Sequence, residues 1–382
     1  MRWKAPLPGS GNSSPIATAD RVFLTSVVGQ GHRRQLRVIA LDRTTGSVDW
    51  YEDVGRPVGT THQRNGHASA TMATDGERVF ACFGAKGLFC YTVAGDLLWH
   101  RAMRGQVHEW GSASSPTLIG PLVVQLVELQ TDSYLVALDA ETGEQRWKTP
   151  RASDGCWTTP VIAWVNEGWQ IVVNGSGSRD GSSGSVQSYD PATGELLWSI
   201  EGTRDIVCPT AIVGDGLIVS TSGANGPIFA IETDGFRSSR GGAPEIRWRL
   251  PNGGPYVPTG VIAGGRLFVV DDDGLLSCIS LDEGKRLWRE RLGSPVSASL
   301  VAAPGRIYAT TESGDVFVVA TGDEYQLLAK NSLHELCLAT PAIAGDELIV
   351  RGERHLFCFV NEQSDAGETP TTEASPSDLP AN

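Results

Sequence analysis

Histidine, tryptophan and charged side chains gather in a few short polar segments of this sequence, and these groups are the best suited to chemistry. Four of the seven histidines lie in such segments, together with three tryptophan and tyrosine residues. Imidazole, indole and charged groups that converge on one site can bind a planar ligand or a peptide. The predicted ligand-binding or partner-binding residues are His62, His67, His108, Glu109, Trp110, Trp157, Arg204, Tyr256 and His334.

A repeated sequence word indicates which elements position these residues. Its clearest copy is 135–147, LVALDAETGEQRW. The first four residues predict a buried strand, and Asp139 and Gly143 bracket a polar turn. Further copies occupy 38–50 and 187–198, and looser copies occupy 88–99 and 276–288. Such self-similarity predicts a repeat architecture.

The tryptophans give the length of the repeat. The steps between Trp3, Trp50, Trp99, Trp147, Trp198, Trp248 and Trp288 are 47, 49, 48, 51, 50 and 40 residues. Short Val-, Ile-, Leu- and Phe-rich segments at this period fit propeller blades of four strands, and no helical pattern of similar length is present. Eight small-residue strand entries, from 13–15 to 339–341, suit inner strands that crowd around one axis. We therefore predict an all-β, eight-bladed propeller of four-stranded antiparallel blades.

The two ends of the repeat region indicate how the ring closes. The eighth unit, from about Ala339 to Phe359, has only three strands, whereas residues 2–9 resemble the last strand of a blade. We expect the N-terminal strand to complete the eighth blade, because this pairing removes two open sheet edges. The predicted domain is 1–360. The Ser/Thr/Pro/Glu-rich segment 361–382 is expected to be a disordered tail.

In a ring of this kind, the loops that leave one blade and enter the next open on one face, around the central channel. The candidate residues lie in these loops, where a rigid scaffold commonly carries its function. Two interpretations stay open. The Trp and His side chains contact a ligand or partner, or they plug the channel by binding loop backbone. No spacing among them fixes a reaction geometry.

The Ala-x-Asp-x-x-Thr-Gly-x-x-x-Trp word resembles the repeat of the quinoprotein-type, or PQQ-like, β-propellers. The resemblance extends from Trp3 to about Phe359. This family includes pyrroloquinoline-quinone-dependent dehydrogenases and outer-membrane assembly scaffolds such as BamB. The sequence departs from the pattern at Thr92 and Ser280, which replace Asp, and at Leu327-Leu328, where Trp is expected.

The resemblance implies two functions. One is a non-catalytic, BamB-like scaffold that binds a protein or small ligand through the loop face, without a cofactor. The alternative is a dehydrogenase that uses pyrroloquinoline quinone with calcium. The family's enzymes carry adjacent cysteines that stack on the quinone, and this sequence has no such pair. Asp154 and Asp205 could act as a base only by their position. We favour the scaffold.

Composition excludes several other classes. A net charge of −13 and a pI near 5.0 argue against nucleic acid as the partner. No apolar run is long enough to span a membrane. No signal peptide precedes the first strand, so a cytoplasmic propeller and a chain lacking its leader are both open. The resemblance implies an extracytoplasmic protein, and we expect a monomer with a protein partner.

Three of the seven cysteines are interpreted as structural. Cys90, Cys278 and Cys358 occupy the place of Ala137 in the word, which indicates small buried strand residues. Cys156 and Cys337 belong to blades on opposite sides of the ring and cannot share one zinc ion. We therefore predict no metal site.

Overall fold

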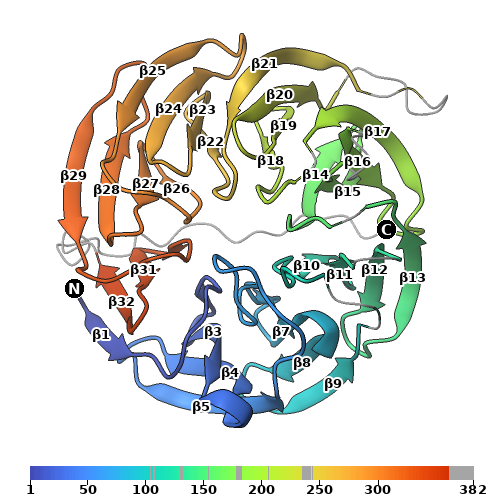
Figure 1. Cartoon of the computed structure of the whole chain (residues 1–382), viewed down its shortest axis with the longest axis vertical. Coiled ribbons are helices and arrows are strands. Elements are labelled where there is room, and N and C mark those ends of the chain that lie inside the picture. Colours follow the sequence, from blue (N-terminus) through green and yellow to red (C-terminus); the bar gives the residue numbers. More distant parts are fainter. Residues whose placement is uncertain are drawn as a thin grey trace, which may run out of the picture.

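The structure is a computed structural model that describes residues 1–103, 105, 108–129, 132–153, 155–177, 183–204, 206–234, 242 and 244–360. Within these residues the chain forms eight four-stranded antiparallel sheets, which stand as blades around a central axis (Figure 1). The predicted eight-bladed, all-β propeller is confirmed. The proposed tail, 361–382, and the candidate bases Asp154 and Asp205 lie outside the described residues.

Each blade has four strands, named A to D from the axis outwards. Blades 1 to 4 consist of β2 (Ile16–Ala17), β3 (Arg21–Val28), β4 (Gln35–Asp42) and β5 (Val48–Gly55); β6 (Ala73–Thr74), β7 (Arg78–Cys82), β8 (Leu88–Thr92) and β9 (Leu97–Arg101); β10 (Thr117–Ile119), β11 (Leu122–Val127), β12 (Tyr134–Asp139) and β13 (Gln145–Pro150); and β14 (Val161–Val165), β15 (Gly168–Asn174), β16 (Gly184–Tyr189) and β17 (Leu196–Thr203).

Blades 5 to 8 follow the same order, except that the last blade takes its D strand from the start of the chain. They consist of β18 (Ile212–Gly214), β19 (Leu217–Thr221), β20 (Gly226–Glu232) and β21 (Ile246–Gly254); β22 (Val261–Ala263), β23 (Arg266–Val270), β24 (Leu275–Ser280) and β25 (Arg286–Arg291); β26 (Val301–Ala303), β27 (Arg306–Thr310), β28 (Asp315–Ala320) and β29 (Leu327–Ser332); and β30 (Ala342–Ala344), β31 (Glu347–Arg351), β32 (His355–Val360) and β1 (Trp3–Pro6).

Helical structure in the described residues is limited to two short 3-10 turns, η1 (Gly31–Arg33) and η2 (Gly84–Lys86). Both lie in the turn between strands B and C of their blades. None of the described helices has the length and apolar character needed to cross a membrane.

The ring closes as predicted. Strand β1 pairs antiparallel with β32, with Trp3 opposite Cys358, so the two ends of the repeat region meet in blade 8 (Figure 1). A cluster of charges supports this closure. Glu347 of β31, whose side chain is only 2% exposed, binds both Arg2 beside β1 and Arg43 of blade 1. The sheet therefore holds the N-terminal strand in blade 8, and the Glu347–Arg43 ion pair joins blade 8 to blade 1.

Neighbouring blades pack through the tryptophan of the repeated word. Trp99 of blade 2, for example, donates its indole N–H to Ala140 O of blade 3 at 3.1 Å, and its ring lies on Gly143. A Cβ at Gly143 would come within 2.5 Å of that ring, and φ is +69° there, so only glycine suits both demands. The same indole-to-carbonyl bond links five other neighbouring pairs through Trp3, Trp50, Trp147, Trp248 and Trp288.

The ladder register explains the cysteines of the word. The residue directly opposite the tryptophan must be small, and it is Ala137 in blade 3, Cys90 in blade 2, Cys278 in blade 6 and Cys358 in blade 8. These three cysteines are buried, and all seven in the chain are free thiols. The prediction that Cys90, Cys278 and Cys358 are small buried strand residues is confirmed.

The seam between blades 7 and 8 differs from the others. The sequence suggested that Leu327-Leu328 replaces the tryptophan, but the register corrects this: Ala329 stands at the tryptophan position, opposite Val318. A cleft of about 500 Å³ lies between these blades, lined by Tyr308, Leu333, Leu348 and Phe359 among others. Loss of the large ring therefore leaves the seam open.

A closed ring of hydrogen bonds joins the eight inner strand entries. In each blade a backbone N–H donates to a Ser or Thr hydroxyl of the next blade, at N···O distances between 2.9 and 3.2 Å. The participants, in order around the axis, are Ser14, Thr71, Ser115, Thr159, Thr210, Thr259, Ser299, Thr340 and again Ser14. The sequence predicted small residues at these positions. The structure adds a second reason for Ser or Thr, because each hydroxyl oxygen accepts a hydrogen bond from the neighbouring blade.

Candidate functional site

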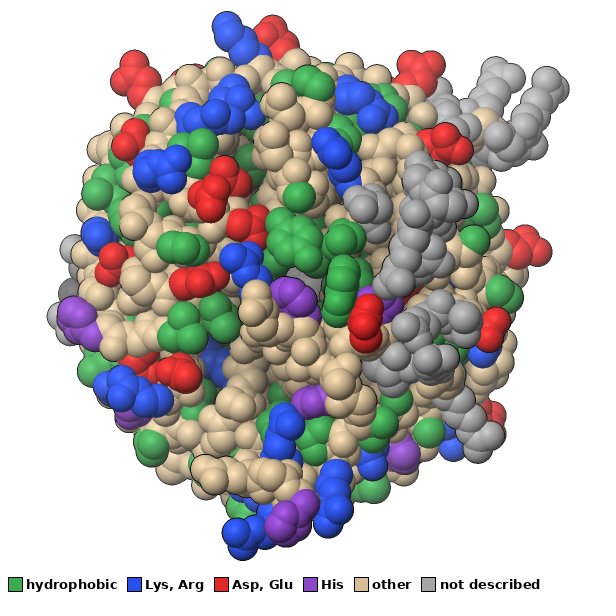
Figure 2. Space-filling view, viewed as in Figure 1, with side chains coloured by type: hydrophobic (Ala, Val, Ile, Leu, Met, Phe, Trp, Pro, Cys, Tyr) green, Lys and Arg blue, Asp and Glu red, His purple; other side chains and the backbone are tan. Residues whose placement is uncertain are grey.

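A cavity of about 190 Å³ lies at the centre of the face formed by the connections between blades. Every one of the eight connections contributes to its lining, which consists of Asn12, His62, Arg64, Asn65, Ser69, Trp110, Ala113, Trp157, Cys208, Tyr256, Val257, Ser297 and Leu338. Figure 2 shows this face, with hydrophobic side chains and a histidine around a central hollow. We call it the central cavity.

Four of the predicted residues meet in this cavity: His62, Trp110, Trp157 and Tyr256. The Trp110 and Trp157 rings lie 5.4 Å apart, and the His62 ring packs edge-on to Trp110 at 5.9 Å. Aromatic groups at these separations attract one another and present a broad, stiff surface. The wall of the cavity is therefore largely aromatic on one side.

His108 lies beneath this wall and supports it. The residue is buried, and its ring contacts Trp110 and Trp157 at 5.2 and 5.0 Å. Its Nδ1 accepts the backbone N–H of Trp110 at 3.1 Å, which fixes the start of the loop. His108 therefore supports the aromatic wall and is not itself among the residues that line the cavity.

The aromatic side chains also bind loop backbone, as the plugging interpretation expects. Trp157 donates its indole N–H to Gly111 O at 2.9 Å, and Asn65 donates to Trp110 O at 2.9 Å. Their rings nevertheless line the cavity. The two interpretations are compatible, because the same contacts that narrow the channel hold the aromatic wall in place.

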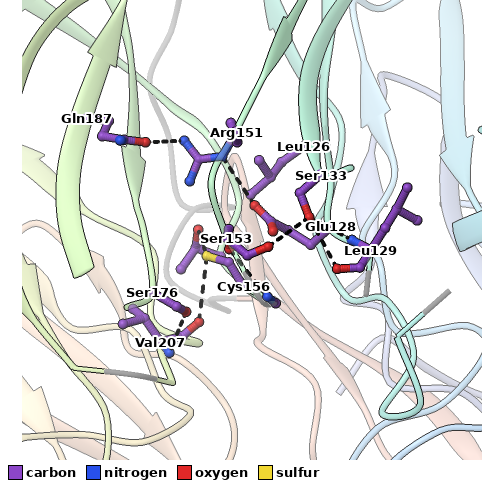
Figure 3. Close-up of polar contacts among 12 residues, drawn as sticks. Leu126, Glu128, Leu129, Ser133, Arg151, Ser153, Cys156, Ser176, Gln187 and Val207 are labelled. Carbon is purple, nitrogen blue, oxygen red and sulfur yellow. Dashed lines mark hydrogen bonds and ion pairs between the residues drawn. The ribbon is translucent and has the colours of Figure 1, made fainter. Parts of the chain in front are cut away.

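The loop that carries Trp157 rests on a buried polar network between blades 3 and 4 (Figure 3). Arg151, which opens the loop, pairs with Glu128 of blade 3 at 3.2 Å and with Gln187 of blade 4 at 2.5 Å. Both members of the ion pair are buried, with side chains 3% and 6% exposed. Ser133 then donates to Ser153 O at 3.3 Å. Trp157 is therefore held by contacts to both blades.

An ion pair that sequence reasoning missed crosses the mouth of the cavity. Arg64, from the connection between blades 1 and 2, reaches Asp272 of blade 6 at 3.3 Å. Asp272 also accepts the backbone N–H of Tyr256 at 2.7 Å. Burial raises the pKa of Asp272, and the Tyr256 hydrogen bond and the Arg64 charge oppose that shift. Asp272 lies in a tight turn, residues 271–274, in which Asp271 accepts two backbone N–H groups.

The remaining predicted residues lie outside the central cavity. His67 is half-buried in a small neighbouring cavity with Phe83, and burial lowers its pKa. Glu109 is exposed, and its backbone carbonyl accepts the Thr60 hydroxyl at 2.7 Å. Arg204 and His334 are exposed on other loops, and His334 adopts a positive φ of 55° that turns its loop.

The described lining offers little for catalysis. It contains no Asp or Glu, and the one thiol, Cys208, has its pKa raised by burial. A protonated thiol is a poor nucleophile. Burial likewise raises the pKa of Cys156. Among the described residues, no group of three His, Cys, Asp or Glu side chains could hold a metal ion.

The described lining also does not fit a quinone held with calcium. Calcium takes six or more oxygen ligands, commonly including carboxylates. The carboxylate beside the mouth, Asp272, is already engaged by Arg64 and a backbone N–H. The aromatic wall could stack on a planar ring, but the charge for the ion is lacking in the described part of the site.

Comparison with known proteins finds similarity both to BamB proteins and to quinoprotein dehydrogenases. The protein named outer membrane protein assembly factor BamB from Burkholderia pseudomallei (strain K96243) is 22% identical over 366 residues, which cover 91% of this chain and 84% of that protein. The crystal structure of BamB from Moraxella catarrhalis matches with a TM-score of 0.66 at 11% identity, covering 96% of this chain and all of the other.

A quinoprotein enzyme shares the fold as well. The structure of quinohemoprotein alcohol dehydrogenase from Comamonas testosteroni matches with a TM-score of 0.71 at 14% identity, over 98% of this chain and 78% of that one. At such identities the likeness concerns the fold alone.

The family model described as outer membrane protein assembly factor BamB matches three overlapping stretches, residues 1–109, 55–235 and 182–364. Together the stretches span all eight blades. The chain therefore belongs to the BamB family of PQQ-like β-propellers.

Proposed function

We propose that this chain is a non-catalytic scaffold that holds a protein partner on the face around the central cavity, and that the partner takes part in outer-membrane protein assembly outside the cytoplasm. Membership of the BamB family supports a scaffold role. The observation that carries the proposal is the central cavity, to which all eight connections contribute. His62, Trp110 and Trp157 form its aromatic wall, and Tyr256 adds a further aromatic side chain to the lining. Aromatic anchors in a preformed hollow are typical of partner-binding hot spots.

The electrostatics of the face agree with this proposal. Arg64 and Asp272 place an ion pair at the rim of an apolar hollow, as in interfaces where a polar rim surrounds an apolar centre. A partner that inserts an apolar side chain would displace loosely held water from the aromatic wall. The rim charges would then set the orientation of the partner.

Site-specific photocrosslinking in the native host tests the proposal. A photoreactive phenylalanine at Tyr256, which lines the cavity, should crosslink one discrete protein. The same group at Tyr51, which is 53% exposed on the outer strand β5, is the matched control and should not.

The double variant Trp110→Ala, Trp157→Ala should keep its β-sheet circular dichroism but lose the crosslink made from Tyr256. Capture of the same protein by the folded double variant would contradict the proposed role of the aromatic wall.

We also propose that the scaffold works without a cofactor. Titration with pyrroloquinoline quinone, with and without calcium, should leave the melting temperature unchanged, because the described lining lacks carboxylates for the ion. A calcium-dependent rise in melting temperature at micromolar quinone would favour the dehydrogenase instead.

A further inference from the structure

A second cavity on the same face is built around a buried arginine. Arg351 is the last residue of β31 in blade 8 and is only 2% exposed. It lines a cavity of about 110 Å³ together with Gly11, Asn12, Leu338 and Glu353. Asn12 and Leu338 also line the central cavity, so the two hollows adjoin. We call the smaller one the Arg351 cavity.

The guanidinium group of Arg351 has unused donors. It carries five N–H groups. Nη1 donates to Ser13 O and Ser13 Oγ at 2.8 and 2.7 Å, and Nη2 donates to Ser26 Oγ at 3.3 Å. Nε is buried and has no hydrogen-bond partner among the described residues. The unused donors therefore lie on the edge shared by Nε and Nη2.

That edge has the geometry that arginine uses for carboxylates. Elsewhere in this chain, Arg37 donates from Nε and Nη2 to the two oxygens of Asp53, at 2.7 and 2.8 Å. Paired bonds of this kind are charge-assisted and specific for planar anions. At Arg351 the same fork is buried, and Nη2 lies beside Gly11 of the cavity wall, where a Cβ would come within 2.9 Å of it.

The positive charge of Arg351 is not balanced by the described residues. None of their carboxylates forms an ion pair with it, and burial lowers its pKa to about 9. Glu335 lies against the cavity wall at Gly352 but is engaged by the backbone N–H groups of Arg354 and His355. A buried charge without a partner is costly, and the folded chain already bears the desolvation of Arg351, so an anion that enters the cavity adds only the cost of its own desolvation.

We propose that the Arg351 cavity binds a carboxylate group, carried by a small free acid or by the end of a peptide chain. Its volume of about 110 Å³ exceeds the ~30 Å³ that one water occupies in the liquid and leaves room for a carboxylate and its first carbons. The proposal stands apart from partner binding, because a free acid tests it directly. A purely structural arginine, by contrast, would show no acetate binding.

Carbon-13-labelled acetate is the probe for the wild-type chain. Its NMR signal should broaden and shift as protein is added, and the shift should reach a plateau. Sodium chloride keeps the ionic strength constant throughout the titration. Arg351→Gln removes the charge and the fork and should weaken acetate binding about tenfold or more, as loss of a charge-assisted pair implies. Arg37→Gln is the matched control, because that arginine is already paired at the surface, and it should bind acetate as wild type does.

The source of the carboxylate is decided by competition. A short peptide with a free C-terminus that displaces acetate, while its amide does not, identifies a chain end. Displacement by succinate but by neither peptide identifies a small acid. Absence of acetate binding to the wild-type chain overturns the proposal, even if Arg351→Gln fails to fold. Undiminished binding by a folded Arg351→Gln variant also overturns it.

Discussion

The ring of hydroxyl acceptors around the axis makes a sharp prediction about stability. In Thr210→Val the side chain keeps its branched shape but loses the oxygen that accepts the Thr159 backbone N–H at 3.2 Å. The bond that Thr210 itself donates to Thr259 is untouched. A backbone donor left without a partner costs about 1–3 kcal/mol. Because both threonines are half-buried, channel water can offset part of this cost, and we expect about 1–2 kcal/mol.

Urea unfolding of Thr210→Val and Thr210→Ser measures the effect. Serine keeps the hydroxyl and is the matched control. With an unfolding entropy of ~2.1 cal/mol/K per residue, about 350 ordered residues give ~0.7 kcal/mol/K, so the melting temperature should fall by about 2 °C in the valine variant. Thr71→Val lies elsewhere in the ring and shares no bond with Thr210, so the two losses should add.

Equal free energies of unfolding for the valine and serine variants would refute this reasoning. They would mean that water replaces the hydroxyl without loss, and that the ring of bonds is incidental to closure. A double variant less destabilised than the sum of its parts would instead show that the first substitution had already loosened the whole ring.

Three further predictions concern two joints between blades and one turn within a blade. Glu347→Gln should lower the free energy of unfolding by about 2–3 kcal/mol, which is less than for a fully buried pair because Arg2 and Arg43 reach solvent. An unchanged urea midpoint would count against a stabilising role for these two ion pairs. The Arg146 hydrogen bond, with further bonds from the turn, lowers the pKa of Asp139 to about 2. The stability that this carboxylate contributes is therefore complete above its unfolded pKa near 4 and is lost as pH falls towards 2. Asp139→Asn should flatten the acid side of the curve of unfolding free energy against pH, and an unchanged acid side would disprove this prediction. Trp248→Phe keeps most of the aromatic ring but loses the hydrogen bond to the next blade, so the free energy of unfolding should fall by about 1 kcal/mol. Trp248→Ala removes the ring as well and should lower it by about 3–5 kcal/mol. Similar urea midpoints for the two variants would contradict this order.

The architecture was predictable because the repeat is periodic. Its small residue, its turn glycine and its tryptophan each have one structural task, and the register of Ala137 against Trp147 shows two of them directly. The hydroxyl ring was also visible in the sequence, since each of the eight strand entries carries Ser or Thr at the same place. The small size of these residues was a sufficient explanation for their type, so the sequence alone did not indicate that their hydroxyl groups accept backbone hydrogen bonds.

The site could be predicted only in part. Periodicity places every connection on one face, and this was enough to bring His62, Trp110, Trp157 and Tyr256 to one cavity. It does not say which side chain of an irregular loop turns towards the axis. His334 is in such a loop and is directed elsewhere by a positive φ.

Contacts across the ring are harder still to predict. Arg64 and Asp272 are 208 residues apart and come from blades on different sides of the axis. Neither belongs to the repeated word, and no local pattern links them. The unused edge of Arg351 has the same character, because Ser13, Ser26 and Arg351 meet only when blade 8 closes against blade 1.

The one seam without a tryptophan is explained by how the ring closes. Six tryptophans donate to the turn between strands C and D of the following blade, and the ring of one of them, Trp99, lies on the turn glycine Gly143. In blade 8 strands C and D are β32 and β1, from opposite ends of the repeat region, so no such turn joins them in the described structure. A tryptophan in blade 7 would have no glycine to receive it, and Ala329 stands in its place. Closure by the N-terminal strand thus removes the docking site and, with it, the need for the docking residue. The open cleft of about 500 Å³ at this seam is the structural cost of joining the ring there.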